Sequence, residues 1–307
     1  MRIGMVGLGK MGGDMATRLR RAGHEVVGYD RTPEVSDVAD LAGLVEALGP
    51  SPRAVWIMVP SGMPTHEAVT TLSELLGGGD VVVDGGNSNW RDSQRHAEEL
   101  SAKGIGFLDV GVSGGVWGLD NGYCLMAGGS AEHVAVLRPA FDALAPPEGF
   151  AHVGQAGAGH FTKMVHNGIE YGLMHAYAEG YELLTAADVE LDADAAIRAW
   201  RQGSVIRSWL LDLLCDALGS DPDLTSIRGE AADSGEGRWT VNEAVRLAVP
   251  LPVISAALFA RFASRQDDSP AMKVVAALRT QFGGHSSQAT DRRPAESVEE
   301  GTTVRST

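Results

Sequence analysis

The feature that most constrains this fold lies at the N-terminus, where residues 2–6 have the pattern of a short apolar strand. The turn Gly7-Leu8-Gly9-Lys10-Met11-Gly12 follows, and then a helical pattern through Met15, Leu19 and Ala22. A G-x-G-x-x-G motif between a strand and a helix is typical of dinucleotide binding. Its glycines permit a tight turn and let the backbone approach a pyrophosphate at the helix N-terminus. The sequence therefore predicts a nucleotide-binding α/β sheet.

An acid at the end of the next strand supports this interpretation. Residues 25–29 form a second strand pattern that ends in Asp30, about 20 residues past the glycines, where such folds hold a ribose hydroxyl. Asp30 could instead only open the turn at residues 30–33. A carboxylate favours NAD, whereas Arg31 offers a contact to the 2′-phosphate of NADP. We predict NAD as the cofactor, with NADP as the second choice. The expected cofactor-binding residues are Gly7, Leu8, Gly9, Lys10, Met11, Gly12, Asp30, Arg31, Thr32, Val59, Pro60, Ser61 and Asn87.

Three further apolar runs, at residues 54–59, 81–84 and 107–110, each end in a glycine-rich or small polar loop. Helical patterns near 64–76 and 90–103 separate them, and this alternation predicts a Rossmann-type doubly wound sheet. A closing strand, a helix and a final short strand are expected over 123–153. Strand patterns then stop, and an all-helical C-terminal domain is expected. We predict a nucleotide-binding domain over 1–154, a helical domain over 155–285 and a disordered tail over 286–307. The expected helices of the second domain cover 158–187, 193–203, 205–218, 241–264 and 269–282.

The first helix of the second domain carries the candidate catalytic groups. Lys163, Asn167, Glu170 and Tyr171 recur at helical spacing and share one face, flanked by His166. Such a face is commonly a solvated surface with one weak Lys–Glu pair. Here the helix continues through the small and apolar residues 172–180, so we expect burial. A buried lysine and a buried glutamate need a reason, and catalysis is the usual one.

Composition narrows the classes of partner. The net charge of −15 disfavours nucleic acid and anionic membranes as partners. No apolar run approaches the length of a transmembrane helix, and the chain enters its first strand at once, so we expect no signal peptide and a cytoplasmic location. Cys124 and Cys215 lie far apart and form no metal or redox motif. No metal site is predicted.

Several motifs together resemble those of a known enzyme family. They are Gly-Gly-Asn at 85–87, Val-Ser-Gly-Gly at 112–115, Lys-Met-Val-His-Asn-Gly-Ile-Glu-Tyr at 163–171, and Arg-x-x-Phe-Gly-Gly-His at 279–285. Over residues 1–285 the chain resembles the decarboxylating 6-phosphogluconate dehydrogenases in their short, NAD-preferring form. The resemblance implies oxidation of 6-phosphogluconate to ribulose 5-phosphate and CO2 with reduction of NAD, in the pentose phosphate pathway or in gluconate use.

The same resemblance implies residue roles. Lys163, with its pKa lowered by desolvation, would take the proton of the C3 hydroxyl and then polarise the ketone. Glu170, with its pKa raised by burial, would protonate the enol left by CO2 loss. Arg279 and His285 match residues that reach the site from a partner subunit, which implies a dimer or tetramer. The implied substrate-binding residues are Asn87, Ser113, Gly114, Gly115, His166, Asn167, Tyr171, Arg265, Arg279 and His285.

The sequence differs from the family pattern at one place, and two alternative functions are considered. Long-form enzymes carry a lysine in the loop that corresponds to 234–238, which here has none, so Arg265 and Arg279 are the candidate phosphate-binding cations. A non-decarboxylating β-hydroxyacid dehydrogenase, such as one for 3-hydroxyisobutyrate, would have no use for Glu170 as an acid. A non-catalytic nucleotide sensor would have no reason to keep Lys163 beside Glu170.

Overall fold

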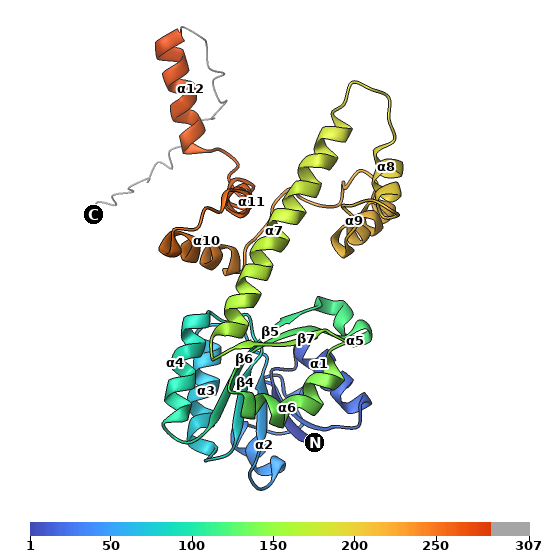
Figure 1. Ribbon diagram of the computed structural model, residues 1–307. Coiled ribbons are helices and arrows are strands. Elements are labelled where there is room, and N and C mark those ends of the chain that lie inside the picture. Colours follow the sequence, from blue (N-terminus) through green and yellow to red (C-terminus); the bar gives the residue numbers. More distant parts are fainter. Residues whose placement is uncertain (284–307) are drawn as a thin grey trace, which may run out of the picture.

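The computed structural model describes residues 1–283, so His285 and the tail predicted at 286–307 lie outside the described part. Its first half is a seven-stranded sheet in the order β2-β1-β3-β4-β5-β6-β7 (Figure 1). The strands β1 to β5 are parallel, β6 is antiparallel to β5, and β7 is parallel to β6. The strands are β1 (Arg2–Val6), β2 (Glu25–Tyr29), β3 (Ala54–Ile57), β4 (Val81–Asp84), β5 (Gly106–Ser113), β6 (Cys124–Gly129) and β7 (Phe150–Gly154).

Helices cover both faces of this sheet. Strand side chains alternate between the faces, so Trp56 and Val83 pack with α1 and α6, whereas Val55 and Val82 pack with α2, α3 and α4. The crossovers bring every carboxyl end of β1 to β5 to the same edge. The predicted Rossmann-type sheet is confirmed. The helices and 3₁₀ turns are α1 (Lys10–Arg21), η1 (Pro33–Val35), α2 (Leu41–Leu48), α3 (Met63–Leu75), α4 (Trp90–Ser101), η2 (Gly115–Trp117), α5 (Gly118–Asn121) and α6 (Ala131–Leu144).

The second half is helical, as predicted, and is built along one 28-residue helix, α7 (Ala158–Thr185). Figure 1 shows α7 rising from the sheet, with α10 and α11 packed beside its middle part and α8 and α9 near its far end. Tyr171 on α7 packs with Leu258, and Tyr177 packs with the small core around Leu211. The remaining helices are α8 (Ala193–Trp200), α9 (Trp209–Ser220), α10 (Glu236–Leu247), α11 (Pro252–Ala263) and α12 (Pro270–Gly283).

The helix predicted over 241–264 is wrong as a single element. The structure begins α10 at Glu236 and ends it before Ala248, whose φ of 54° is left-handed. The chain resumes helical geometry only at Pro252, which occupies the first turn of α11. The two prolines at 250 and 252 explain the break, since neither can donate the N–H that a continuous helix needs. The early start places Glu236 on a helix instead of in the predicted loop.

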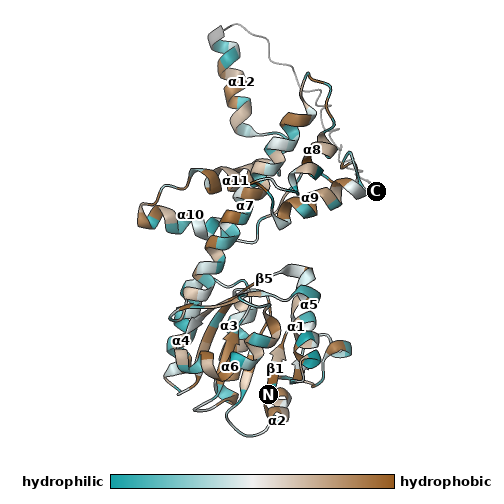
Figure 2. Cartoon of the chain, turned by 45° about the vertical axis from the view of Figure 1, so that its right-hand side comes forward, coloured by the Kyte–Doolittle hydropathy of each residue, from teal (hydrophilic) through white to brown (hydrophobic). Residues whose placement is uncertain are grey.

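Large apolar side chains remain exposed on the helical half. Figure 2 shows hydrophobic residues on α10, α11 and α12 as well as inside the sheet domain. In both views α12 stands away from the other helices. No described helix is both long enough and apolar enough to span a bilayer. The exposed apolar side chains of these three helices include Val245, Leu247, Val253, Phe259, Met272, Val274, Val275 and Leu278.

Candidate active site

A buried aspartate fixes the start of α7 against the sheet. Asp109 on β5 is fully buried, and its two carboxylate oxygens accept hydrogen bonds from the backbone N–H groups of Gly157 (2.7 Å) and His160 (2.8 Å). These groups lie at the N-terminus of a helix, where backbone amides lack partners and a negative charge is favourable. Gly159 is required here, because a Cβ atom would lie 2.3 Å from the Asp109 carbonyl oxygen. Sequence reasoning missed Asp109; its only signal was a carboxylate between apolar residues of a strand.

Lys163 follows one turn later and lies against the carboxyl edge of the sheet. Its side chain is packed on Gly111 of β5, where an added Cβ atom would lie 2.4 Å from the Cβ of Lys163. The residue is 7% exposed. Within residues 1–283 its amine has no ion-pair partner within 4.0 Å. Desolvation lowers the pKa of Lys163 from the ordinary value of 10.5, while Glu170, Glu236 and Cys124 oppose that shift.

The predicted substrate-binding residues of β5 and α7 are brought together. Ser113 Oγ lies 3.3 Å from Nε2 of His166, and Nδ1 of the same ring lies 3.1 Å from Oδ1 of Asn167. Glu170 lies on the same helix, and its Oε2 atom is 3.9 Å from Nδ1 of His166. The expected burial of Glu170 is wrong, because its side chain is 38% exposed. Solvent thus reaches this carboxyl group in the single chain.

The far end of this face contains a cation that sequence reasoning missed. The guanidinium of Arg261 lies 3.7 Å from the ring centroid of Tyr171, which is buried. Its Nη1 donates to the Ala232 carbonyl, and no carboxylate pairs with it among the described residues. Arg265, one of the two predicted phosphate cations, is instead paired with Asp233 at 3.0 Å. No signal in the sequence points to Arg261, because its contact with Tyr171 arises only where α11 packs on α7.

The glycine loop has the geometry that a dinucleotide needs. Gly7 has a φ of 90°, and a Cβ atom at Gly12 would lie 2.0 Å from the Gly7 carbonyl oxygen. Nothing lies within 4 Å of the Cβ position of Gly9, and no side chain caps α1 there. The open backbone and free helix N-terminus fit a pyrophosphate. Asp30 accepts hydrogen bonds from the N–H groups of Leu8 and Thr32, so it both ends β2 and forms the turn.

The other predicted residues lie on loops or outside the site. Val59, Pro60 and Ser61 follow β3, and Asn87 is exposed after β4, so they share the edge of the sheet with the glycine loop. Gly114 and Gly115 have left-handed φ values of 136° and 54° after β5. Arg279 is exposed on α12, which lies far from the sheet domain of its own chain (Figure 1). Lys10 points to Asp14 at 3.4 Å, and Arg31 follows Asp30 on the surface.

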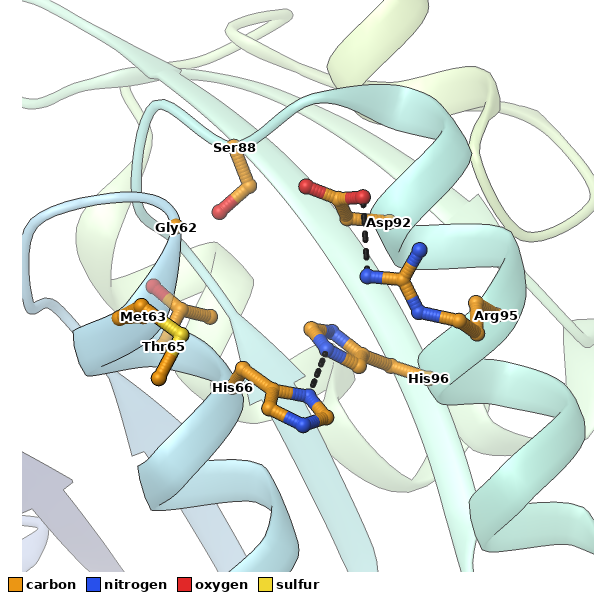
Figure 3. A pocket seen from close by; sticks show the side chains of 8 residues that line it. All are labelled: Gly62, Met63, Thr65, His66, Ser88, Asp92, Arg95 and His96. Carbon is orange, nitrogen blue, oxygen red and sulfur yellow. Dashed lines mark hydrogen bonds and ion pairs between the residues drawn. The ribbon is translucent and has the colours of Figure 1, made fainter.

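A cavity of about 290 Å³ lies between the first turns of α3 and α4 (Figure 3). His66 Nδ1 lies 3.3 Å from His96 Nε2, and Asp92 pairs with Arg95 at 3.0 Å. Neither Lys163 nor Glu170 lines this cavity, so the candidate reaction site lies elsewhere. No group of three or more potential metal ligands occurs within residues 1–283. The cavity is lined by Gly62, Met63, Thr65, His66, Ser88, Asp92, Arg95 and His96.

A dinucleotide-type sheet whose carboxyl edge faces a buried lysine on a helical domain defines a two-domain dehydrogenase. Two family models match the chain. The NAD-binding domain of 6-phosphogluconate dehydrogenase matches residues 2–157, and the C-terminal domain of 6-phosphogluconate dehydrogenase matches residues 159–301. The chain belongs to the 6-phosphogluconate dehydrogenase family.

Individual relatives agree with this assignment. The NAD(+)-dependent, decarboxylating 6-phosphogluconate dehydrogenase of Haloferax volcanii is 43% identical over 296 residues, which cover 93% of this chain and 98% of the relative. The Plasmodium falciparum 6-phosphogluconate dehydrogenase structure has a TM-score of 0.79 at 25% identity and covers 96% of this chain and 67% of that one. A Mycobacterium tuberculosis 3-hydroxyisobutyrate dehydrogenase structure has a TM-score of 0.69 at 24% identity, over 91% and 99% of the two chains, and shares the fold.

Proposed function

We propose that this chain catalyses the NAD-dependent oxidative decarboxylation of 6-phosphogluconate to ribulose 5-phosphate and CO2. The observation that carries the proposal is the buried, unpaired Lys163 at the carboxyl edge of β5, beside Ser113, His166 and Asn167. Desolvation lowers the pKa of the amine and so favours the neutral form that acts as a base, and the neighbouring hydroxyl, imidazole and amide suit a polyhydroxy acid. Family membership and the name of the Haloferax relative support the same reaction.

The residues divide the reaction between them. Bound NAD supplies the hydride acceptor. Neutral Lys163 takes the proton of the C3 hydroxyl as that carbon is oxidised, and the ammonium formed then polarises the new ketone so that CO2 leaves. The enol that remains needs a proton at C1, and Glu170 supplies it in this proposal. Glu170 lies two turns of α7 beyond Lys163, about 10 Å along the helix axis, so the two side chains must converge on neighbouring carbons of one substrate.

The substrate phosphate is assigned to Arg261 instead of Arg265. Two arginines share the buried Asp233, because Arg238 and Arg265 both donate hydrogen bonds to it. The hydrogen bonds from Arg238 and Arg265, together with their charges, lower the pKa of Asp233 to about 2, so the aspartate offsets much of their attraction for an anion. Arg261 has no such partner among residues 1–283 and lies on the ring of Tyr171, a predicted substrate-binding residue. The NAD preference rests on Asp30, with NADP as the second cofactor.

The functional unit in this proposal is a homo-oligomer, a dimer or tetramer. The apolar side chains that α10, α11 and α12 leave exposed are of the kind that subunits bury against each other. Arg279 on α12 and His285 beyond it would enter the partner's site. Further parts of the proposal are the domain limits at 154 and 285, a cytoplasmic location, and a role in the pentose phosphate pathway or in gluconate use.

An absorbance assay of NAD and NADP reduction tests the function directly. We expect turnover with 6-phosphogluconate, one CO2 released per NADH formed, and much weaker turnover with unphosphorylated gluconate. NADH formation from 3-hydroxyisobutyrate without CO2 would favour the non-decarboxylating alternative, which shares this fold. Cofactor binding without reduction by any sugar acid would favour a nucleotide sensor.

A further inference from the structure

A second glutamate, which sequence reasoning did not single out, is buried near Lys163. Glu236 is the first residue of α10 and is 2% exposed. Its Oε2 atom accepts a hydrogen bond of 2.5 Å from Ser234 Oγ. Its Oε1 atom is buried and has no hydrogen-bond partner in the described part of the chain. A carboxylate oxygen left without a partner is costly, so its retention requires an explanation.

The first turn of α10 is held on the part of α7 that carries Lys163. The Thr240 hydroxyl lies 2.8 Å from the carbonyl oxygens of both Met164 and Glu236, and so links the two helices. Gly168 permits this approach, because a Cβ atom there would lie 2.9 Å from Thr240 Cγ2. Gly237 packs on the Tyr171 ring, with a Cβ position 2.8 Å away. The turn therefore lies on α7 between Met164 and Tyr171.

Three titratable groups act on the Lys163 amine, and each belongs to a different helix or strand. Glu170 acts from α7 itself, Glu236 from α10 and Cys124 from β6. Glu170 has the largest of these three effects, but its side chain is 38% exposed, so water screens its charge. Glu236 is buried, where a charge acts more strongly over the same distance. Lys163 thus packs on Gly111 of β5, and α10 contributes a buried carboxylate that acts on its amine.

We propose that Glu236 is a positioning residue that acts through Lys163, its carboxylate stabilising the ammonium that forms when Lys163 takes the substrate's hydroxyl proton. The O–H and C–H bonds at the substrate's C3 break, the proton forms an N–H bond on Lys163, and the hydride would pass to NAD. Holding that proton inside the site keeps the ammonium in place while the ketone loses CO2. This inference rests on the proposed function. The plain alternative is that Glu236 only stabilises the N-terminus of α10 by its charge.

The experiment compares Glu236→Gln with Glu243→Gln. Glu243 is a second buried carboxylate on α10, paired with Arg91 and Arg246, and it is not among the groups that act on Lys163. In Glu236→Gln, Lys163 loses a negative neighbour, so the acidic limb of the kcat/KM profile for 6-phosphogluconate moves to lower pH. We also expect kcat to fall by about tenfold. In Glu243→Gln the acidic limb of the kcat/KM profile should lie at the same pH as in the wild type. In Glu236→Asp, which retains the negative charge, it should lie close to the wild-type pH.

A second measurement does not depend on turnover. The rate of reductive methylation of Lys163, followed by peptide mass spectrometry across pH, reports when the amine is neutral. In Glu236→Gln this rate rises at lower pH than in the wild type. If that variant does not fold, Glu236→Met removes the same charge without leaving a buried amide. The inference would be overturned if Glu236→Gln changed neither the pH profile of kcat/KM nor the pH dependence of Lys163 methylation. Wild-type protein that is inactive on 6-phosphogluconate would instead overturn the proposed function.

Discussion

The backbone N–H of Leu8 donates a 2.7 Å hydrogen bond to Oδ2 of Asp30, so the acid at the end of β2 also holds the glycine loop. The other oxygen accepts from the N–H of Thr32 at 2.9 Å. These bonds, with that from Thr32 the largest, lower the pKa of Asp30. The carboxylate therefore remains charged at neutral pH, and in the proposed complex it would accept from the 2′-hydroxyl of NAD and repel the 2′-phosphate of NADP.

The first prediction concerns cofactor choice. Asp30→Ala removes both the repulsion of NADP and the support of the glycine loop. We expect kcat/KM for NAD to fall by about 10- to 100-fold, as for the loss of one or two charged hydrogen bonds. The ratio of kcat/KM for NADP to that for NAD should rise, while the NADP value stays modest because the loop is loosened. Steady-state kinetics with both cofactors measures this, and an unchanged ratio would refute the role of Asp30.

The second prediction concerns the base. Lys163→Ala should lower kcat by about 10²- to 10⁴-fold, the usual contribution of a positioned general base. NAD binding should persist, because the glycine loop and Asp30 do not contact Lys163. Cofactor titration by fluorescence, beside the absorbance assay, separates the two effects. Full activity in this variant would end the proposed mechanism.

Replacing the same lysine should also raise the stability of the folded chain. Burial lowers the pKa of Lys163 in the folded chain below the 10.5 of the unfolded chain. The Lys163 amine therefore binds its proton more tightly in the unfolded chain than in the folded chain. This difference lowers the free energy of unfolding at neutral pH, and the loss is recovered as the pH rises toward 10.5. We expect Lys163→Met to raise Tm at pH 7, with a smaller gain near pH 10. Thermal unfolding at the two pH values checks this, and a Tm that falls at pH 7 contradicts it.

The next prediction concerns Asp109, whose hydrogen bonds hold the N-terminus of α7 against the sheet and so anchor this helix. Asp109→Asn keeps the size of the side chain but offers an amide N–H₂ to one of two backbone donors, at Gly157 or His160. We expect a loss of about 2–4 kcal/mol in the free energy of unfolding, since a buried group is left unpaired beside a helix N-terminus. Asp92→Asn, at a partly exposed pair, should cost about 1 kcal/mol or less. Urea unfolding of both variants gives the comparison, and equal losses would argue against the anchor.

How far the sequence determined these conclusions depends on the range of the contacts involved. The glycine loop and Asp30 lie within one strand–helix–strand unit, and the shared face of Lys163 and Tyr171 follows from helical spacing, so both could be predicted. The break between α10 and α11 was missed by the prediction of one helix over 241–264, although the prolines at 250 and 252 signal it. Asp109, Glu236 and Arg261 could not be found in this way, because their roles arise where segments far apart in the chain meet. The exposure of Glu170 likewise depends on what packs beside α7.

The assignment of the phosphate to Arg261 gives the last prediction. Arg261→Gln should raise KM for 6-phosphogluconate by about 100-fold, as expected for one charge-assisted contact, with little effect on KM for unphosphorylated gluconate. Arg265→Gln is the matched control, because it is nearby but bound to Asp233, and its effect should be several-fold smaller. A phosphate competitor should likewise inhibit the wild type and Arg265→Gln more strongly than Arg261→Gln. If Arg265→Gln instead shows the larger, phosphate-specific loss, the cation is Arg265 as the sequence predicted, and Asp233 does not neutralise it.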